Sequence, residues 1–186
     1  MTNAFVKKIM LFISTILLSN IICAAQYQYF VNQATNQTLT APYVYYNYQP
    51  SPAMDRAIKN LPDYSSVKKC ATNNVTDAII ILKPILFYNP QSTILYGDLN
   101  VKVYQTRSKD QANPDNFIKK MKISLWKVVK FDEVTISYYV NEIYTELLKK
   151  LITETDSLKI DKNYPTNGSY CDLLSTLKES RLNLNY

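Results

Sequence analysis

The chain of 186 residues contains no histidine and only two glycines, Gly97 and Gly168. Histidine is the side chain that most often transfers protons near neutral pH, and it is also the commonest transition-metal ligand. Its absence excludes Ser-His-Asp and Cys-His catalysts. Because the two glycines are far apart, no glycine-rich phosphate-binding loop can form. We therefore expect a protein that uses no nucleotide cofactor and has no metal site.

The chain does contain enough apolar residues for a core, 47% of the total, and more basic than acidic side chains, 21 against 15. This length and composition are typical of one domain and argue against wholesale disorder. We expect residues 26–40 to be a flexible leader, residues 41–158 an α+β domain, and residues 159–186 a tail with a short helix.

Residues 1–25 have the build of a secretory signal peptide. Two lysines precede an apolar stretch, and the small residues Cys23-Ala24-Ala25 come before Gln26. We expect cleavage after Ala25 and a periplasmic or secreted protein. A retained membrane anchor is the alternative, although the apolar stretch is interrupted by polar residues and is short for a membrane span. Lipidation of Cys23 is disfavoured because Ile22 stands where a lipoprotein signal has a small residue.

Two cysteines remain after such a cleavage, Cys70 and Cys171. In an oxidising compartment a single bridge between them would close a long loop and stabilise the protein by about 4 to 5 kcal/mol on the chain-entropy model. We predict this disulfide, with two buried free thiols as the alternative. Neither cysteine belongs to a Cys-x-x-Cys motif, so a redox-catalytic role is not indicated.

The apolar pattern predicts an antiparallel sheet with helices packed on it. Residues 51–61 and 136–152 have apolar side chains at helical spacing, and the second run extends over more than four turns. Residues 117–131 fit either a strand or a helix, and we favour a strand. Pro84 lies inside the most apolar segment, where we expect a bend, because proline cannot donate to a sheet ladder. The predicted order is a strand (41–49), a helix (51–61), a three-strand meander (78–88, 93–105 and 119–131), the long helix (136–152) and a short terminal helix (170–182).

Catalytic motifs are weak. Ser-x-x-Lys spacings occur as expected by chance in a lysine-rich chain, without the companion motifs of the penicillin-recognising enzymes. Paired carboxylates can hydrolyse glycosidic bonds, and the candidates are Asp98, Asp110, Asp115 and Asp132-Glu133. Negative charge at the start of a helix is stabilising, so Asp132-Glu133 is better explained as the opening of the long helix. We expect no enzyme, and a carboxylate-dependent hydrolase is the least favoured alternative.

Two groups of residues are candidates for binding. The first is a basic segment around Trp126 that could face anionic lipid, glycan or nucleic acid, or could simply guard a strand edge against aggregation. The second is a tyrosine-rich strand that could stack on a ligand, or could place its rings on both faces of a sheet. Export makes nucleic acid an improbable partner. The candidate residues are Lys119, Lys120, Lys122, Trp126, Lys127 and Lys130, and Tyr43, Tyr45, Tyr46 and Tyr48.

The segments DAIIILKPILFYNP, TILYGDLNVKVYQ and SYYVNEIYTELLKKL form the predicted hairpin and the long helix that closes the domain. In this element order the chain resembles small envelope proteins of Gram-negative bacteria, namely the auxiliary components of ABC-type lipid transport and the lipopolysaccharide-assembly lipoprotein. The resemblance implies a non-catalytic periplasmic accessory protein that binds an envelope protein or anionic lipid or glycan, with at most peripheral membrane contact. A secreted virulence or host-interaction protein is the alternative.

Overall fold

The structure of the protein is a computed structural model. It describes residues 26–32, 36–62, 67–71, 75–105, 113, 115–132, 134–158, 160–161, 166–167 and 169–177. The expected signal peptide, residues 1–25, lies outside the described residues, and so does Cys23.

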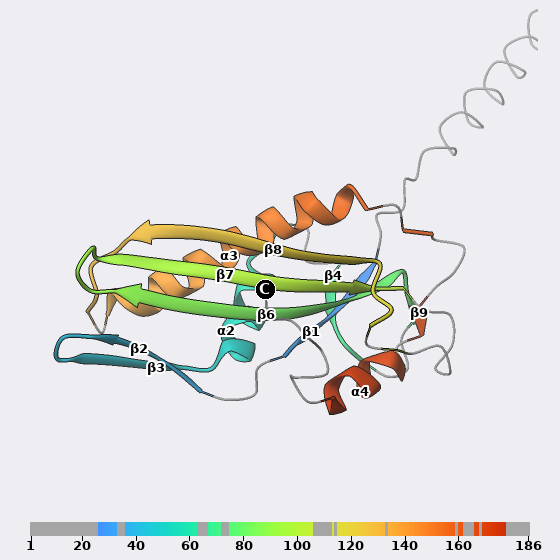
Figure 1. Cartoon of the computed structure of the whole chain (residues 1–186), viewed down its shortest axis with the longest axis horizontal. Helices are drawn as coiled ribbons and strands as arrows, with labels where there is room; N and C mark the ends of the chain where they lie inside the picture. The colour runs from blue at the N-terminus through green and yellow to red at the C-terminus, as the bar shows by residue number, and fades with distance from the viewer. Residues whose placement is uncertain are drawn as a thin grey trace, which may run out of the picture.

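A five-stranded sheet in the order β4-β1-β6-β7-β8 forms the centre of the molecule (Figure 1). The strands β6, β7 and β8 are an antiparallel meander, whereas β1 pairs parallel to both β4 and β6. The five strands are β1 (Tyr27–Val31), β4 (Val67–Lys69), β6 (Ala78–Asn89), β7 (Ile94–Tyr104) and β8 (Lys119–Val128).

Two helices cover one face of this sheet and enclose the main core. They are α2 (Pro50–Lys59) and α3 (Thr135–Asp156), and the buried side chains of α3 include Ile143 and Leu147. Even-numbered residues of β6 such as Ile80 and Leu82 belong to the same core, whereas Ile79 and Ile81 belong to a second core on the opposite face. Burial on both faces explains why the sequence of β6 is continuously apolar.

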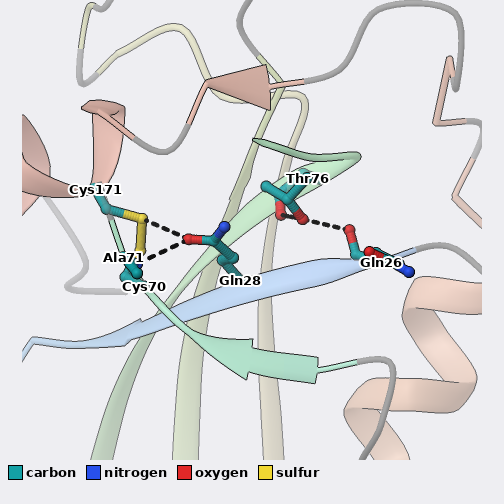
Figure 2. The surroundings of a disulfide bond; sticks show 7 residues. Gln26, Gln28, Cys70, Ala71, Thr76 and Cys171 are labelled. Atoms are coloured by element: carbon teal, nitrogen blue, oxygen red, sulfur yellow. Dashed lines mark hydrogen bonds between the residues drawn. A yellow bond between two sulfur atoms is a disulfide. The ribbon is translucent and has the colours of Figure 1, made fainter. Parts of the chain in front are cut away.

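The second core lies under the C-terminal tail, where α4 (Ser169–Thr176) covers one end of the outer face of the sheet. Cys70 and Cys171 form the predicted disulfide, with 5.7 Å between their Cα atoms. The side chain of Gln28 lies beside it (Figure 2): its Oε1 accepts a hydrogen bond from the backbone N–H of Ala71 at 3.0 Å and lies 3.5 Å from Cys171 Sγ. A short pairing of β5 (Val75–Thr76) with β9 (Thr166–Asn167) adds a second attachment.

The α+β class, the meander, the long helix on the sheet and the disulfide-linked tail are confirmed. Residues 26–40 differ from the expected flexible leader, because they include β1, which pairs inside the sheet. The predicted strand 41–49 contributes β3 (Val44–Tyr48), but it pairs with β2 (Gln37–Ala41) in a separate hairpin. Because β1 pairs parallel to β4 and β6, the central sheet is mixed, whereas we expected an antiparallel sheet.

At Pro84, where we expected a bend, the β6–β7 register runs without a bulge through the pair Pro84 and Leu99. The carbonyl of Leu82 accepts a hydrogen bond at 2.8 Å from Asn32, which follows β1, so the peptide groups of Leu82 point toward β1. Peptide groups alternate in direction along a strand, so the nitrogen of Pro84 points to the same side as Leu82. The next bond of the β1–β6 ladder would need an N–H on residue 84, so the ladder ends at Leu82.

Candidate binding surface

Strand β8 divides the predicted basic segment between two faces of the sheet. Side chains alternate along a strand, and Met121 and Ile123 are buried against the main core under α3. Lys119 and Lys127 therefore lie on the side of α3, whereas Lys120, Lys122 and Trp126 lie on the outer face. Lys130 follows the end of β8 and is exposed. The structure thus does not bring all five predicted lysines together as one patch.

Lys127 is held by α3 and is not available to an anionic ligand. Its ammonium group lies 2.5 Å from Glu142 Oε1 and 2.9 Å from Glu146 Oε1. Partial burial would lower the pKa of Lys127, but the hydrogen bonds and the charges of the two glutamates outweigh this effect and raise its pKa. Lys127 attaches β8 to α3, a role that the sequence did not indicate.

Lys122 is also paired, in this case with Asp98 of β7. Lys122 Nζ lies 2.9 Å from Asp98 Oδ2, and the hydroxyl of Ser124 donates to Asp98 Oδ1 at 2.6 Å. Asp98 was one candidate catalytic acid, and here it joins two cross-strand neighbours. The outer face of β8 therefore has both signs of charge.

The carboxylate of Asp132 has the structural role that the sequence favoured. Its Oδ1 accepts hydrogen bonds from the backbone of Val134 at 3.1 Å and of Thr135 at 2.8 Å, in the first turn of α3. The hydrogen bonds from Thr135 lower the pKa of Asp132. Its neighbour Glu133 lies outside the described residues. Among the residues described, no cluster of three or more acidic or cysteine side chains could hold a metal ion.

The four candidate tyrosines separate into an exposed pair and a pair that packs on the core, of which Tyr46 is partly buried and Tyr48 buried. Tyr43 is fully exposed in the turn between β2 and β3, and Tyr45 is 70% exposed. Tyr46 and Tyr48 stack with ring centroids 6.0 Å apart and pack on the core, where burial raises the pKa of Tyr48 to about 12. The rings thus point to both sides of the hairpin, and the four do not form one stacking platform.

An exposed apolar patch lies on the outer face of the sheet, next to the β6–β7 turn. Phe87, Tyr96 and Trp126 are direct neighbours across β6, β7 and β8, and the rings of Phe87 and Tyr96 are 6.2 Å apart. Phe87 is 60% exposed, Trp126 62% and Val128 65%, and Tyr96 is 38% exposed. We call these four residues the outer patch. Single exposed apolar residues are common, whereas a contiguous exposed aromatic group is a candidate binding surface.

Sequence reasoning identified Trp126 but missed its neighbours in the outer patch. Phe87 lies in a segment that reads as completely buried, because its alternate residues fill two different cores. The cross-strand register, which brings Phe87 beside Tyr96, could not be read from the sequence. The tail also covers only part of the outer face, so the same strand side is buried at one end and exposed at the other.

The covered end of this face contains a buried lysine. Lys102 is 1% exposed, and its ammonium group lies 4.5 Å from the ring centroid of Phe117. Burial lowers the pKa of Lys102, and the positive charge of Lys120 lowers it further. An aromatic face stabilises a cation, so the contact with Phe117 partly compensates the loss of hydration.

A second surface feature is a groove of about 500 Å³ beside β8. One wall is the first half of β8, from Lys119 to Ser124, and the other is formed by Lys150, Thr153 and Glu154 of α3. In Figure 1, α3 crosses the sheet diagonally, and its C-terminal half runs beside β8. Lys150 was not a predicted site residue, because helical periodicity does not show which exposed residues will face a strand edge.

Comparison with known proteins shows no match to a family model and none to a curated protein. Among solved structures, the chain is similar to protein XCC0632 from Xanthomonas campestris, which is assigned to the family DUF330. The two are 14% identical, with a TM-score of 0.47 over 72% of this chain and 88% of that chain. In the part of the chain that the structure describes, no helix is both long and apolar enough to cross a membrane.

Proposed function

We propose that this protein is a non-catalytic accessory protein of the cell envelope, and that it binds a partner protein through the outer patch. The carrying observation is the row Phe87, Tyr96 and Trp126, which is exposed on a sheet face whose other end is covered by α4. Aromatic side chains bury a large area at a small entropic cost, and they are enriched at the centres of protein interfaces.

The charges around the outer patch favour a protein over an anionic membrane surface. Lys122 is paired with Asp98, and Lys127 lies on the other face with two glutamates. A surface that binds anionic lipid needs unpaired positive charge near the apolar residues. A mixed and partly neutralised surface with an aromatic centre is typical of a protein interface.

An envelope location is supported by the disulfide between Cys70 and Cys171, because such bonds persist in oxidising compartments. A role without catalysis is supported by the use of two of the candidate carboxylates. Asp98 binds two neighbouring side chains, and Asp132 accepts the first backbone N–H groups of α3. Both carboxylates are engaged in holding the fold.

Photo-crosslinking in the native host tests the proposed surface. A photoreactive phenylalanine analogue at position 126 should give a discrete adduct with another protein, whereas the same analogue at Lys149, which is exposed on α3, should not. The captured protein is then purified and its affinity measured directly. Trp126→Ala should weaken binding by roughly 30-fold, as expected for an interface residue contributing about 2 kcal/mol. Lys149→Glu is the control and should leave the affinity unchanged.

Flotation with vesicles of phosphatidylglycerol and phosphatidylethanolamine separates this proposal from membrane binding. We expect the protein not to float with the vesicles at physiological salt. Adducts formed only with lipid, flotation that depends on Trp126, or equal affinity of wild type and Trp126→Ala for the captured protein would overturn the proposal.

A further inference from the structure

The outer edge of β8 is free of a neighbouring strand among the residues that the structure describes. Val129 donates to Thr93 at 2.8 Å, and this bond continues the β7–β8 register, so odd-numbered residues of β8 form the hydrogen bonds to β7. Peptide groups alternate along a strand, so those of Lys122, Ser124 and Trp126 point away from β7. Lys150 Nζ lies 3.4 Å from the carbonyl oxygen of Ser124, which confirms the direction.

The groove between β8 and α3 lies along this edge. It follows the six residues from Lys119 to Ser124, which in an extended strand span about 20 Å. An extended peptide placed there would hydrogen-bond to the outward peptide groups of β8, and its side chains on one face would contact α3. Addition of a strand between a sheet edge and a helix is a recurrent mode of peptide recognition.

The charge of the groove indicates which kind of peptide it would bind. Its lining includes Lys119, Lys120 and Lys150, together with Lys122, which is paired with Asp98, and a single acidic residue, Glu154. Lys119 and Lys150 are exposed at opposite walls. Acidic side chains on a bound strand would lie close to these ammonium groups. A second copy of this chain would instead bring the same lysines to the groove, and like charges on facing strands are destabilising.

We propose that β8 accepts an extended, acidic peptide segment of a partner protein as a sixth strand of the sheet, in the groove between β8 and α3. This inference goes beyond the proposed function, because it concerns a different surface from the outer patch. Backbone hydrogen bonds to β8 would supply the affinity, and Lys119 and Lys150 would select acidic residues.

Selection from a phage library of random ten-residue peptides, with the purified protein as bait, tests the proposal. We expect the enriched peptides to contain Asp or Glu at alternate positions. Ser124→Pro should weaken binding of the best peptide at least tenfold, since proline removes the outward N–H of residue 124 and no backbone hydrogen bond to β7; it also removes the hydroxyl that donates to Asp98. Ser124→Ala is the matched control, because it keeps the N–H and removes only the hydroxyl, and it should bind within twofold of wild type.

If circular dichroism shows that Ser124→Pro is misfolded, charge variants still test the proposal. Lys150→Glu should weaken binding at least tenfold at low salt, whereas Lys149→Glu, on the adjacent position of α3 and outside the groove lining, should not. Methylation of every second backbone nitrogen of the peptide should abolish binding for one of the two alternating sets of nitrogens, the set that faces β8, and not for the other. Failure to enrich peptides, enrichment without acidic residues, equal binding by Lys150→Glu, or dimers through β8 by light scattering would overturn the proposal. None of these outcomes depends on Trp126, so the two proposals fail separately.

Discussion

Gly97 is the position where the smallest substitution should have the largest structural effect. It lies in β7 opposite Leu86 of β6, and it faces α3. A Cβ atom at this position would overlap Cγ2 of Ile143, and it would lie 3.2 Å from Leu147 Cδ1 and 3.3 Å from Leu86 Cδ2. The backbone of Gly97 does not have a positive φ, so the restriction is one of space alone.

Gly97→Ala should therefore reduce the free energy of unfolding by about 1 to 3 kcal/mol, the usual cost of overfilling a packed core. Urea denaturation followed by circular dichroism measures this loss. The structure also predicts which second substitution should compensate for this loss, namely one at Ile143. Ile143→Ala alone should cost about 2 to 5 kcal/mol through the cavity that it leaves. In the double variant the new methyl group at residue 97 would occupy part of that cavity.

The double variant should accordingly be more stable than the sum of the two single losses predicts, by at least about 1 kcal/mol, because contacting residues are not independent. A matched control is Ile136→Ala, at another fully buried position of α3, which should combine additively with Gly97→Ala. An unchanged midpoint for Gly97→Ala, or additivity with Ile143→Ala within about 0.5 kcal/mol, would refute the packing argument.

Three further predictions concern the disulfide and two charged groups. Replacing Cys70 and Cys171 by serine should lower the free energy of unfolding by about 4 to 5 kcal/mol, since the bridge joins residues 101 positions apart, and reductant should destabilise wild type but not this variant in urea titrations. Lys127→Met should cost less than about 1 kcal/mol of stability, because the pair with Glu142 is partly exposed. The pKa of Lys127 is raised, so this stabilisation is present below about pH 10.4 and is lost as the pH rises through the folded-state pKa. Thermal melts at two pH values would show this loss. The lowered pKa of Asp132 predicts a contribution that is present above about pH 4 and is lost as the pH falls through the folded-state pKa; Asp132→Asn should flatten the acid limb of the stability profile, and a carboxyl titration by NMR that gives an ordinary pKa would contradict this.

The secondary structure was predictable where apolar residues recur with the regular spacing of a helix or of a strand. The long helix and the strands of the meander have a regular repeat, so their existence follows from burial of one face or of both. Residues 26–40 were misjudged because β1 is short and polar in part, and its burial depends on pairing with β6, about fifty residues later in the chain. Such pairing leaves no local signal in five residues.

The candidate site was predictable only as a set of residue types. Trp126 and the lysines of β8 were identified, but which of them pair with acids depends on Asp98, Glu142 and Glu146 in other elements. A single sequence does not show these distances. The groove beside β8 was missed for the same reason, since Lys150 becomes part of it only through the diagonal crossing of α3.

The parallel insertion of β1 between β4 and β6 has a consequence for how the chain reaches its native state. β1 emerges from the ribosome before either of its neighbours, so its backbone groups have no strand to bind on one side until synthesis has passed Lys69, and none on the other until it has passed Leu82. Non-local pairing of this kind slows folding and prolongs the lifetime of aggregation-prone intermediates. The β6–β7 hairpin can close locally, so the first strand to be made is among the last to be incorporated.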